Sequence, residues 1–328
     1  MNVRLALRSP GLWLLALFSL FGMGCTPPTL GLRPLAPVTE PAGVVHTPRW
    51  LATPDGQHLL VQNWRPASGA PRGVLVLVHG LKDHGSRYQD FAAQMAGRGL
   101  SVHALDLRGH AHSTGMRVGI DSFGEYLDDL DRVVHDVQAI EHRSDYFLLG
   151  HSMGGAIATL YVIDRKATPR GLILSAAALE VDAPGPKVGG TKMIAALWPD
   201  AGIFQLDLDD FSRDKATVAA AKDDPMVFQG KAPALMAREL IAAIQHIEKN
   251  RAQVTIPVLA LHGTADRVTP PDGSKRLIAE ASSTDKTLRL YDGLYHDLLH
   301  EPERAQVSTE IASWIDARLA PAPSPPAR

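Results

Sequence analysis

Short apolar runs alternate with segments of helical spacing through the central part of the chain. Six runs bounded by turn residues have the pattern of strands buried on both faces of a parallel sheet; they lie at 73–78, 100–105, 146–149, 171–175, 256–261 and 287–291. Helical spacing follows the first and third runs, over 89–98 and 153–165. An antiparallel hairpin over 51–64, with Asp55 and Gly56 in its turn, precedes them. The pattern predicts an α/β fold with a mostly parallel central sheet and helices on both faces.

One segment, from about 180 to 253, interrupts this alternation. It contains no strand-like run, whereas 191–197 and 234–247 have helical spacing. Connections between neighbouring elements have a median length of about 4–6 residues, so this segment is far too long to be an ordinary loop. We therefore expect an inserted helical cap.

The chain begins with an apolar segment that is charged only at its start. Arg4 and Arg8 precede 11–24, which has no ionisable side chain. A bilayer core needs about 20 apolar residues, whereas a basic start followed by a shorter apolar run is typical of a secretory signal peptide. We expect residues 1–24 to be such a peptide and the protein to be exported; a buried hydrophobic helix is the alternative.

Cys25, the single cysteine of the chain, directly follows Gly22-Met23-Gly24. Small residues here suit ordinary signal-peptidase cleavage, and they also resemble a bacterial lipobox, in which the cysteine is acylated and becomes the new N-terminus. Such signals usually have Leu at the position of Gly22. An unpaired cysteine is unusual in an exported protein unless it is modified. The expectation is a membrane-anchored lipoprotein, with a periplasmic or secreted protein as the alternative.

Proline-rich segments flank the part of the chain that we expect to fold. Six prolines fall within 26–48, and four of the nine residues of 320–328 are proline. Such composition favours extended, poorly packed chain. The predicted organisation is therefore a tether over 25–48, one folded domain over 49–319 and a disordered tail over 320–328.

Overall charge and cysteine count exclude several classes of protein. The chain has 33 Lys and Arg against 35 Asp and Glu, a formal net charge of −2. A nucleic-acid binder that works through excess positive charge is excluded by this balance. One cysteine allows neither an intramolecular disulfide nor a cysteine-ligated zinc site.

Candidate catalytic residues follow the predicted strands, because an open parallel sheet places its chemistry at the carboxyl ends. Gly150-His151-Ser152-Met153-Gly154 lies between a strand and a helix and matches the nucleophile elbow; a turn whose serine caps the helix is the alternative. A serine nucleophile needs a base and an acceptor that orients the base, in the order serine, acid, histidine on this topology. Asp266 and His296 follow later strands in that order.

Neighbouring residues leave some choice in this assignment. Asp292 and Asp297 lie near His296, but both are too close to it in sequence to form an independent orienting arm. His300, four residues after His296, is the alternative base.

Backbone donors for the oxyanion come from two places on this topology. One is the residue after the nucleophile, Met153, and the other is in the loop after the first parallel strand, His79-Gly80-Leu81. Leu81 is the predicted second donor, and His79 is interpreted as a structural turn residue.

A group of potential metal ligands, Asp106, His110 and His112, lies beside Arg108. Dinuclear hydrolase sites need further carboxylate or histidine ligands nearby, and no second cluster is evident. We therefore favour a turn fastened by Asp106 and Arg108, with no metal and no cofactor.

Taken together, the motifs resemble the monoacylglycerol lipase and lysophospholipase branch of the serine α/β-hydrolases. The resemblance covers nearly all of 49–319 and is carried by HGLKDHGSRYQ at 79–89, DLRGHAHSTG at 106–115, GHSMGG at 150–155, FSRD at 211–214, DDPMVFQGK at 223–231, HGTADRVTPP at 262–271 and YDGLYHDLLHE at 291–301. It implies an α/β-hydrolase fold, a triad of Ser152, Asp266 and His296, and oxyanion donors at Leu81 and Met153. It also implies a cap whose apolar face admits an acyl chain and rests on a lipid surface.

The expected activity is hydrolysis of a single-chain lipid ester, such as monoacylglycerol or lysophospholipid, through an acyl-serine intermediate. The expected partners are this lipid and a membrane surface, with no nucleic acid. A general carboxylesterase or an acyltransferase of the same fold is the first alternative. A catalytically idle protein that binds a lipid or a partner through its cap is the second.

Overall fold

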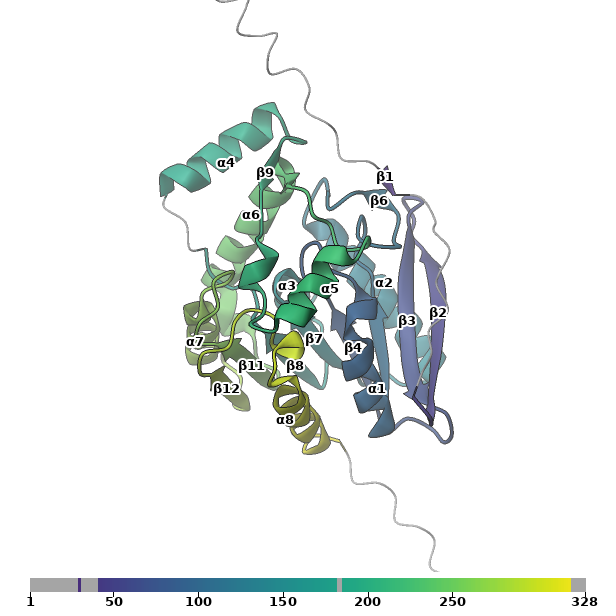
Figure 1. Ribbon diagram of the computed structural model, residues 1–328. Helices are drawn as coiled ribbons and strands as arrows, with labels where there is room; N and C mark the ends of the chain where they lie inside the picture. The colour runs from purple at the N-terminus through teal and green to yellow at the C-terminus, as the bar shows by residue number, and fades with distance from the viewer. Residues whose placement is uncertain (1–28, 31–40, 182–184, 320–328) are drawn as a thin grey trace, which may run out of the picture.

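The central sheet has eight strands in the part of the chain that the computed structural model describes, residues 29–30, 41–181 and 185–319. Their order is β12-β11-β8-β7-β4-β5-β3-β2 (Figure 1). The bounds are β2 Val44–Ala52, β3 His58–Pro66, β4 Gly73–Val78, β5 Leu100–Leu105, β7 Phe147–His151, β8 Gly171–Ser175, β11 Val258–Gly263 and β12 Lys286–Tyr291. The last six of these are parallel, whereas β3 is antiparallel to β5 and β2 to β3. The mostly parallel sheet predicted from the apolar runs is confirmed.

Strand ends differ from the prediction where the sequence is not apolar. β7 continues past the apolar run to the buried His151, and β11 continues to the buried Gly263. At its other end β11 begins at Val258, because Pro257 has no N–H to donate to a neighbouring strand. The leading hairpin is longer than expected, and β2 begins at Val44, inside the predicted tether.

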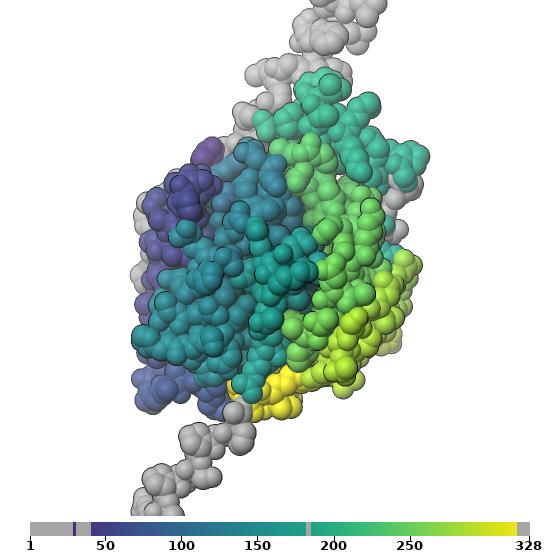
Figure 2. All heavy atoms as spheres, turned by 180° about the vertical axis from the view of Figure 1, so that it is seen from behind, coloured from purple at the N-terminus to yellow at the C-terminus, as the bar shows by residue number. Residues whose placement is uncertain are grey.

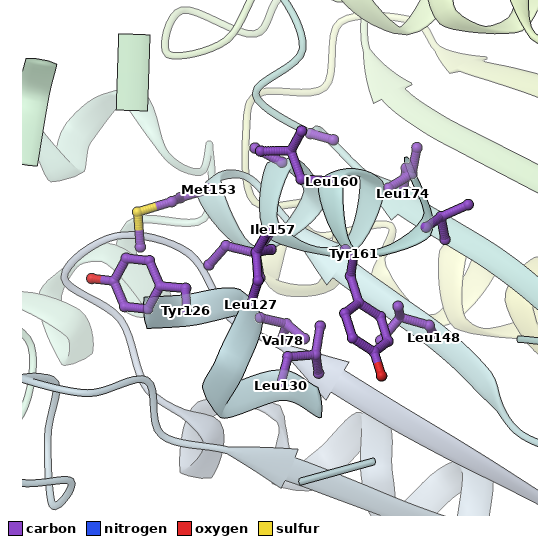
Figure 3. Close-up of a cluster of buried hydrophobic side chains, with 14 of the residues drawn as sticks. Val78, Tyr126, Leu127, Leu130, Leu148, Met153, Ile157, Leu160, Tyr161 and Leu174 are labelled. Carbon is purple, nitrogen blue, oxygen red and sulfur yellow. The ribbon is translucent and has the colours of Figure 1, made fainter. Parts of the chain in front are cut away.

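Helices cover both faces of the sheet, as predicted (Figure 1). α1 (Gln89–Gly97) and α8 (Arg304–Asp316) pack on one face. On the other lie α2 (Gly124–Glu141), α3 (Met153–Asp164) and α7 (Pro271–Glu280). Figure 3 shows side chains of α2 and α3 packed against those of β4, β7 and β8.

Sequence reasoning missed the 18-residue α2. Its buried residues have helical spacing: they include Tyr126, Leu127, Leu130, Val133, Val134 and Val137. The signal was therefore present in the sequence, between β5 and β7, two parallel strands on either side of β4 whose connection must cross over the sheet.

The cap lies between β8 and β11, where the sequence predicted it. It contains α4 (Gly185–Leu197), α5 (Lys215–Asp223) and α6 (Ala234–Asn250). It also contains a short antiparallel pair, β9 (Gly202–Phe204) with β10 (Ala232–Pro233). This pair left no strand-like run in the sequence, because strands of two or three residues are too short to produce one.

A two-residue strand, β1 (Thr29–Leu30), pairs antiparallel with β6 (Gly115–Met116) in the loop region that follows β5. The predicted signal peptide, Cys25 and the predicted tail 320–328 lie outside the described residues. Within the described ranges, no helix combines the length and the apolar character needed to cross a membrane.

Candidate active site

Ser152 occupies a strained turn between β7 and α3. Its φ of +53° lies in a region that residues with a Cβ rarely adopt. The strain is held by tight packing: a Cβ on Gly150 would lie 2.4 Å from the Gly154 carbonyl oxygen, and one on Gly154 would lie 2.2 Å from the Val78 carbonyl oxygen. Glycine is therefore required on both sides of Ser152, as a nucleophile elbow demands.

Asp266 and His296 meet at the same edge of the sheet, from the loops after β11 and β12. Nδ1 of His296 lies 2.8 Å from Oδ2 of Asp266, and both side chains are fully buried. The backbone N–H groups of Val268 and Thr269 donate to the other carboxylate oxygen at 2.8 and 3.0 Å. The carboxylate is therefore fixed by its own loop and directed at the imidazole.

Asp266 stays ionised in this environment. Burial alone would raise its pKa, but the nearby His296 and the hydrogen bonds from His262 and His296 outweigh burial and hold the pKa of Asp266 well below its usual range. A charged acceptor at Nδ1 places the proton of neutral His296 on that nitrogen, which leaves Nε2 with a lone pair.

Nε2 of His296 is buried and has no hydrogen-bond partner among the described residues. The ring stands beside His151, the neighbour of Ser152 in sequence, with centroids 4.8 Å apart. The cap residue Phe211 meets the imidazole edge-on at 5.1 Å. These contacts orient the ring next to the elbow with one nitrogen free to accept a proton.

The alternative acids and base have other partners. Asp292 is exposed and accepts a hydrogen bond from the Thr264 hydroxyl at 3.1 Å. Asp297 lies 2.8 Å from Nδ1 of His300, and Nε2 of His300 is 2.8 Å from the Arg87 carbonyl oxygen. Both nitrogens of His300 are thus engaged, so the geometry favours His296 as base and Asp266 as its partner.

The predicted oxyanion donors flank the elbow. Met153 is the first residue of α3, where N–H groups have no acceptor within the helix. Leu81 follows Gly80, on which a Cβ would lie 3.0 Å from Cβ of Ser152. The loop after β4 therefore passes directly over the serine, and only glycine at position 80 fits this approach without displacement of a neighbour.

Two positioning residues were missed by the sequence reasoning. Nε2 of His262 lies 3.0 Å from Oδ2 of Asp266, and Nδ1 of the same ring lies 2.8 Å from the Ser274 hydroxyl. The Thr269 hydroxyl is 3.0 Å from Oδ2 of Asp266 and 3.1 Å from Nδ1 of His296. Both residues lie in the HGTADRVT motif, so their proximity to Asp266 in sequence was the available signal.

A buried ion pair connects the loop after β4 with the loop after β12. Arg87 contacts Asp83 at 2.8 Å and Asp297 at 3.2 Å. Burial would raise the pKa of Asp83, but the charge of Arg87 outweighs it and lowers that pKa. The pair thus ties the segment that carries Leu81 to the segment that carries His296.

Lys82, directly after Leu81, is buried next to the site, and sequence reasoning did not reveal this. Its side chain is buried, and its ammonium group has no hydrogen-bond partner in the described part of the chain. Nζ lies 5.8 Å from the ring centroid of Phe228 in the cap, and the Phe228 N–H donates to the Lys82 carbonyl oxygen at 3.1 Å. Burial lowers the pKa of Lys82 to about 8.

The group considered as metal ligands forms a fastened turn instead. Asp106 accepts a hydrogen bond from the Gly85 N–H at 2.8 Å, and Arg108 makes two hydrogen bonds of 2.7 Å with Asp129. Among the described residues, no three histidine, cysteine or acidic side chains are grouped to hold a metal ion.

Comparison with known proteins shows the family and the fold of this chain. Residues 69–303 match the family described as serine aminopeptidase, S33. The chain is 38% identical over 267 residues to a monoacylglycerol lipase of Mycolicibacterium smegmatis, an alignment that covers 80% of this chain and 95% of that one. It is 33% identical to the human monoglyceride lipase, with 84% and 93% covered. The crystal structure of a monoacylglycerol lipase from Paleococcus ferrophilus superposes with a TM-score of 0.70 at 30% identity, with 79% and 99% covered.

Proposed function

Because this chain belongs to the S33 family of serine α/β-hydrolases, we propose that it hydrolyses the ester bond of a single-chain lipid, monoacylglycerol or lysophospholipid. The observation that carries the proposal is the buried pair of Asp266 and His296, 2.8 Å apart, beside a serine held at a φ of +53°. The 38% identity over 267 residues to a monoacylglycerol lipase supports the substrate class.

In the first half of the reaction, Nε2 of His296 takes the proton of Ser152 as Oγ attacks the ester carbonyl carbon. The N–H groups of Leu81 and Met153 stabilise the oxyanion. Asp266 balances the positive charge of the imidazolium, which then gives its proton to the departing glycerol oxygen. In the second half, His296 takes a proton from water as its oxygen attacks the acyl-serine carbonyl carbon. The imidazolium then returns this proton to Oγ of Ser152 as the ester bond to the serine breaks, and the fatty acid leaves.

Replacement of the nucleophile tests the mechanism. Ser152→Ala is expected to lower kcat on a p-nitrophenyl ester by about 10⁴-fold or more. Ser175→Ala is the matched control, because Ser175 is also buried and its hydroxyl has no hydrogen-bond partner among the described residues. Full activity in Ser152→Ala would exclude the mechanism. Failure of a fluorophosphonate to label folded wild-type protein would favour the idle lipid-binding alternative.

A substrate panel tests the lipid class. Monoacylglycerol, a lysophospholipid and a short-chain ester are compared by kcat/KM on the full chain. The proposal expects a long single acyl chain to be preferred. A preference for the short-chain ester would indicate a general carboxylesterase, and acyl transfer to added glycerol in place of hydrolysis would indicate an acyltransferase.

We also propose that Cys25 is acylated and anchors the protein to a membrane after export. The small residues before the single cysteine support this proposal. Intact-mass measurement of detergent-extracted protein is expected to give a chain that begins at an acylated Cys25. An unmodified N-terminus in a soluble fraction would exclude it.

A further inference from the structure

Lys82 lies where the loop after β4 meets the cap. It directly follows the predicted oxyanion donor Leu81, and Gly80 of the same loop comes so close to Ser152 that an added Cβ would lie 3.0 Å from the serine Cβ. From the cap, the Phe228 N–H donates to the Lys82 carbonyl oxygen at 3.1 Å. Figure 2 shows the green cap residues packed directly against blue and teal residues of the sheet domain. Lys82 is therefore enclosed between the cap and the loop that passes over the nucleophile.

A lysine at this position is unfavourable for the fold in two respects. Its φ of +69° lies in the left-handed region, where a residue with a Cβ is strained. The residue is only 3% exposed although it carries an ammonium group, and the burial of an unpaired charge costs free energy. The stability of the fold therefore does not explain Lys82. Residues that are costly for the fold are concentrated at functional sites, where a ligand compensates the cost.

The Lys82 ammonium has no partner of opposite charge in the described part of the chain. Nζ makes no hydrogen bond there, and burial is the only cause of its lowered pKa, with no carboxylate acting against it. Asp83, the next residue, is engaged with Arg87 at 2.8 Å. Asp224, in the cap segment that meets this loop, is engaged with Nε2 of His84 at 2.9 Å. An anionic ligand would supply the missing partner.

A second buried cation reaches the same residue of the cap. The ring centroid of Phe228 lies 5.8 Å from Nζ of Lys82 and 5.4 Å from Cζ of Arg117. Arg117 is buried, and its guanidinium donates to the Met226 carbonyl oxygen at 2.8 Å. The face of an aromatic ring attracts a cation but does not replace a charged hydrogen-bond acceptor. Two cations at one ring make this junction electropositive, which favours an anionic ligand.

Covalent geometry places the ammonium at a distance that suits the phosphate of a single-chain glycerophospholipid. Nζ of a lysine lies at most about 6 Å from its own Cα, so Nζ of Lys82 stays within about 10 Å of the Leu81 Cα. In such a lipid, the phosphorus lies about 7 Å from the ester carbonyl carbon when the glycerol is extended. A charge-assisted hydrogen bond of about 2.8 Å then joins the ammonium to a phosphate oxygen. The acyl chain is hydrocarbon, so the anion belongs to the alcohol half of the ester.

We propose that Lys82 forms an anion subsite for the phosphate of a net-anionic lysophospholipid, such as a 1-acylglycerol 3-phosphate, while the ester carbonyl binds at Leu81 and Met153. The inference rests on the proposed hydrolysis of single-chain lipid esters, and it selects a head group within that class. The phosphate pairs with the buried ammonium. Monoacylglycerol has only hydroxyl groups in its head group and leaves the ammonium without an ionic partner, so it is the poorer substrate.

Two substrates that differ only in the phosphate test the head group. 1-Octanoylglycerol and 1-octanoylglycerol 3-phosphate are compared by kcat/KM below their critical micelle concentrations, so that the surface charge of an aggregate plays no part. Wild type is expected to favour the phosphate ester by about tenfold or more. Lys82→Met keeps the length of the side chain but removes its charge. It should lower kcat/KM for the phosphate ester by about tenfold more than for 1-octanoylglycerol.

Lys231→Met is the matched control for this measurement. Lys231 is an exposed lysine of the cap, close to Phe228 in sequence, and its replacement should leave the wild-type ratio of the two kcat/KM values unchanged. Equal falls for the two substrates in Lys82→Met would mean that the lysine only fills space between the cap and the loop. Equal kcat/KM values for the two substrates in wild type would also overturn the proposal.

Calorimetric titration with glycerol 3-phosphate separates the subsite from the reaction. The ligand is expected to bind wild type and Ser152→Ala with the same Kd, and to bind Lys82→Met at least about tenfold more weakly. Binding that depends on Lys82, without hydrolysis of either lipid, would refute the proposed function and support the subsite. Hydrolysis of both lipids at one rate, without binding of glycerol 3-phosphate or with equal binding by wild type and Lys82→Met, would refute only the subsite.

Discussion

Glycine has opposite roles in the nucleophile elbow and in the cap helix α4. Added Cβ atoms on Gly150 and Gly154 would meet backbone atoms at 2.4 and 2.2 Å, but those on Gly189 and Gly190 would meet nothing within 4 Å. In the elbow, glycine permits a contact that no other residue allows. In α4 it adds backbone freedom to a helix whose surroundings are open.

The difference follows from what each region must do. The elbow holds one backbone conformation against strain, so that Ser152 stands in a fixed relation to the loops after β4 and β12. α4 packs against α6, but Ala195 is the only buried residue among 185–197, so most of this helix faces open space. Tight packing is thus concentrated at the carboxyl edge of the sheet, whereas the glycines of α4 face open space.

The largest expected effect comes from the acid at the rigid edge. Asp266→Asn keeps the size of the side chain but offers an N–H₂ group to Nδ1 of His296, which favours the wrong tautomer. We expect kcat to fall by about 10⁴-fold with little change in the melting temperature. Asp292→Asn, at an exposed neighbour, should retain activity. Equal losses in the two variants would show that the 2.8 Å contact to Asp266 does not orient the base.

Gly154→Ala should have the next largest effect. The new Cβ would lie 2.2 Å from the Val78 carbonyl oxygen and 2.5 Å from that of His79, and neither backbone can move without disturbing β4. We expect the free energy of unfolding, measured by urea denaturation, to fall by about 3 kcal/mol. A variant as stable as wild type would mean that the elbow is not tightly packed.

Lys82 lies where the carboxyl edge of the sheet meets the cap. Its replacement should change the free energy of unfolding by less than Gly154→Ala does. Its pKa is lowered to about 8 in the folded state, so the buried charge destabilises the fold below pH 8. Lys82→Met is expected to raise the free energy of unfolding at pH 7 by about 2 kcal/mol.

The pH dependence provides the check on Lys82. Between pH 8 and the ordinary pKa of lysine, the unfolded chain binds more protons than the folded one, so wild-type stability rises with pH. The difference in the free energy of unfolding between Lys82→Met and wild type should therefore become smaller as the pH is raised from 7 to about 10. Lys192→Met, at an exposed lysine of α4, should show no such gap.

The smallest effect is expected in α4 itself. Gly189→Ala has open space for its Cβ and should raise the free energy of unfolding by about 0.5–1 kcal/mol through helix propensity, if α4 unfolds with the domain. Urea denaturation followed by circular dichroism would measure this change in the free energy of unfolding. A loss of stability comparable to that of Gly154→Ala would abolish the contrast between the two regions.

Most of the sheet could be predicted because buried parallel strands leave a local pattern. The runs at 73–78, 100–105 and 171–175 coincide with β4, β5 and β8. The predicted strand ends are wrong where a buried strand residue is not apolar, as at His151 in β7 and Gly263 in β11. The β9–β10 pair was missed for a related reason, since its strands are shorter than any window in which a period can be recognised.

The sequence by itself determined the order of the elements, the glycines around Ser152 and the set of acids and histidines that follow the strands. Only the tertiary structure decided which of them meet. Asp266 contacts His296 across 30 residues of sequence, while the adjacent Asp297 faces Arg87 and His300. It also decided that Lys82 is buried and that Thr29 and Leu30 pair with Met116 and Gly115 of β6. Residue type and period are local properties, whereas distance and burial depend on how loops from separate strands converge at one edge.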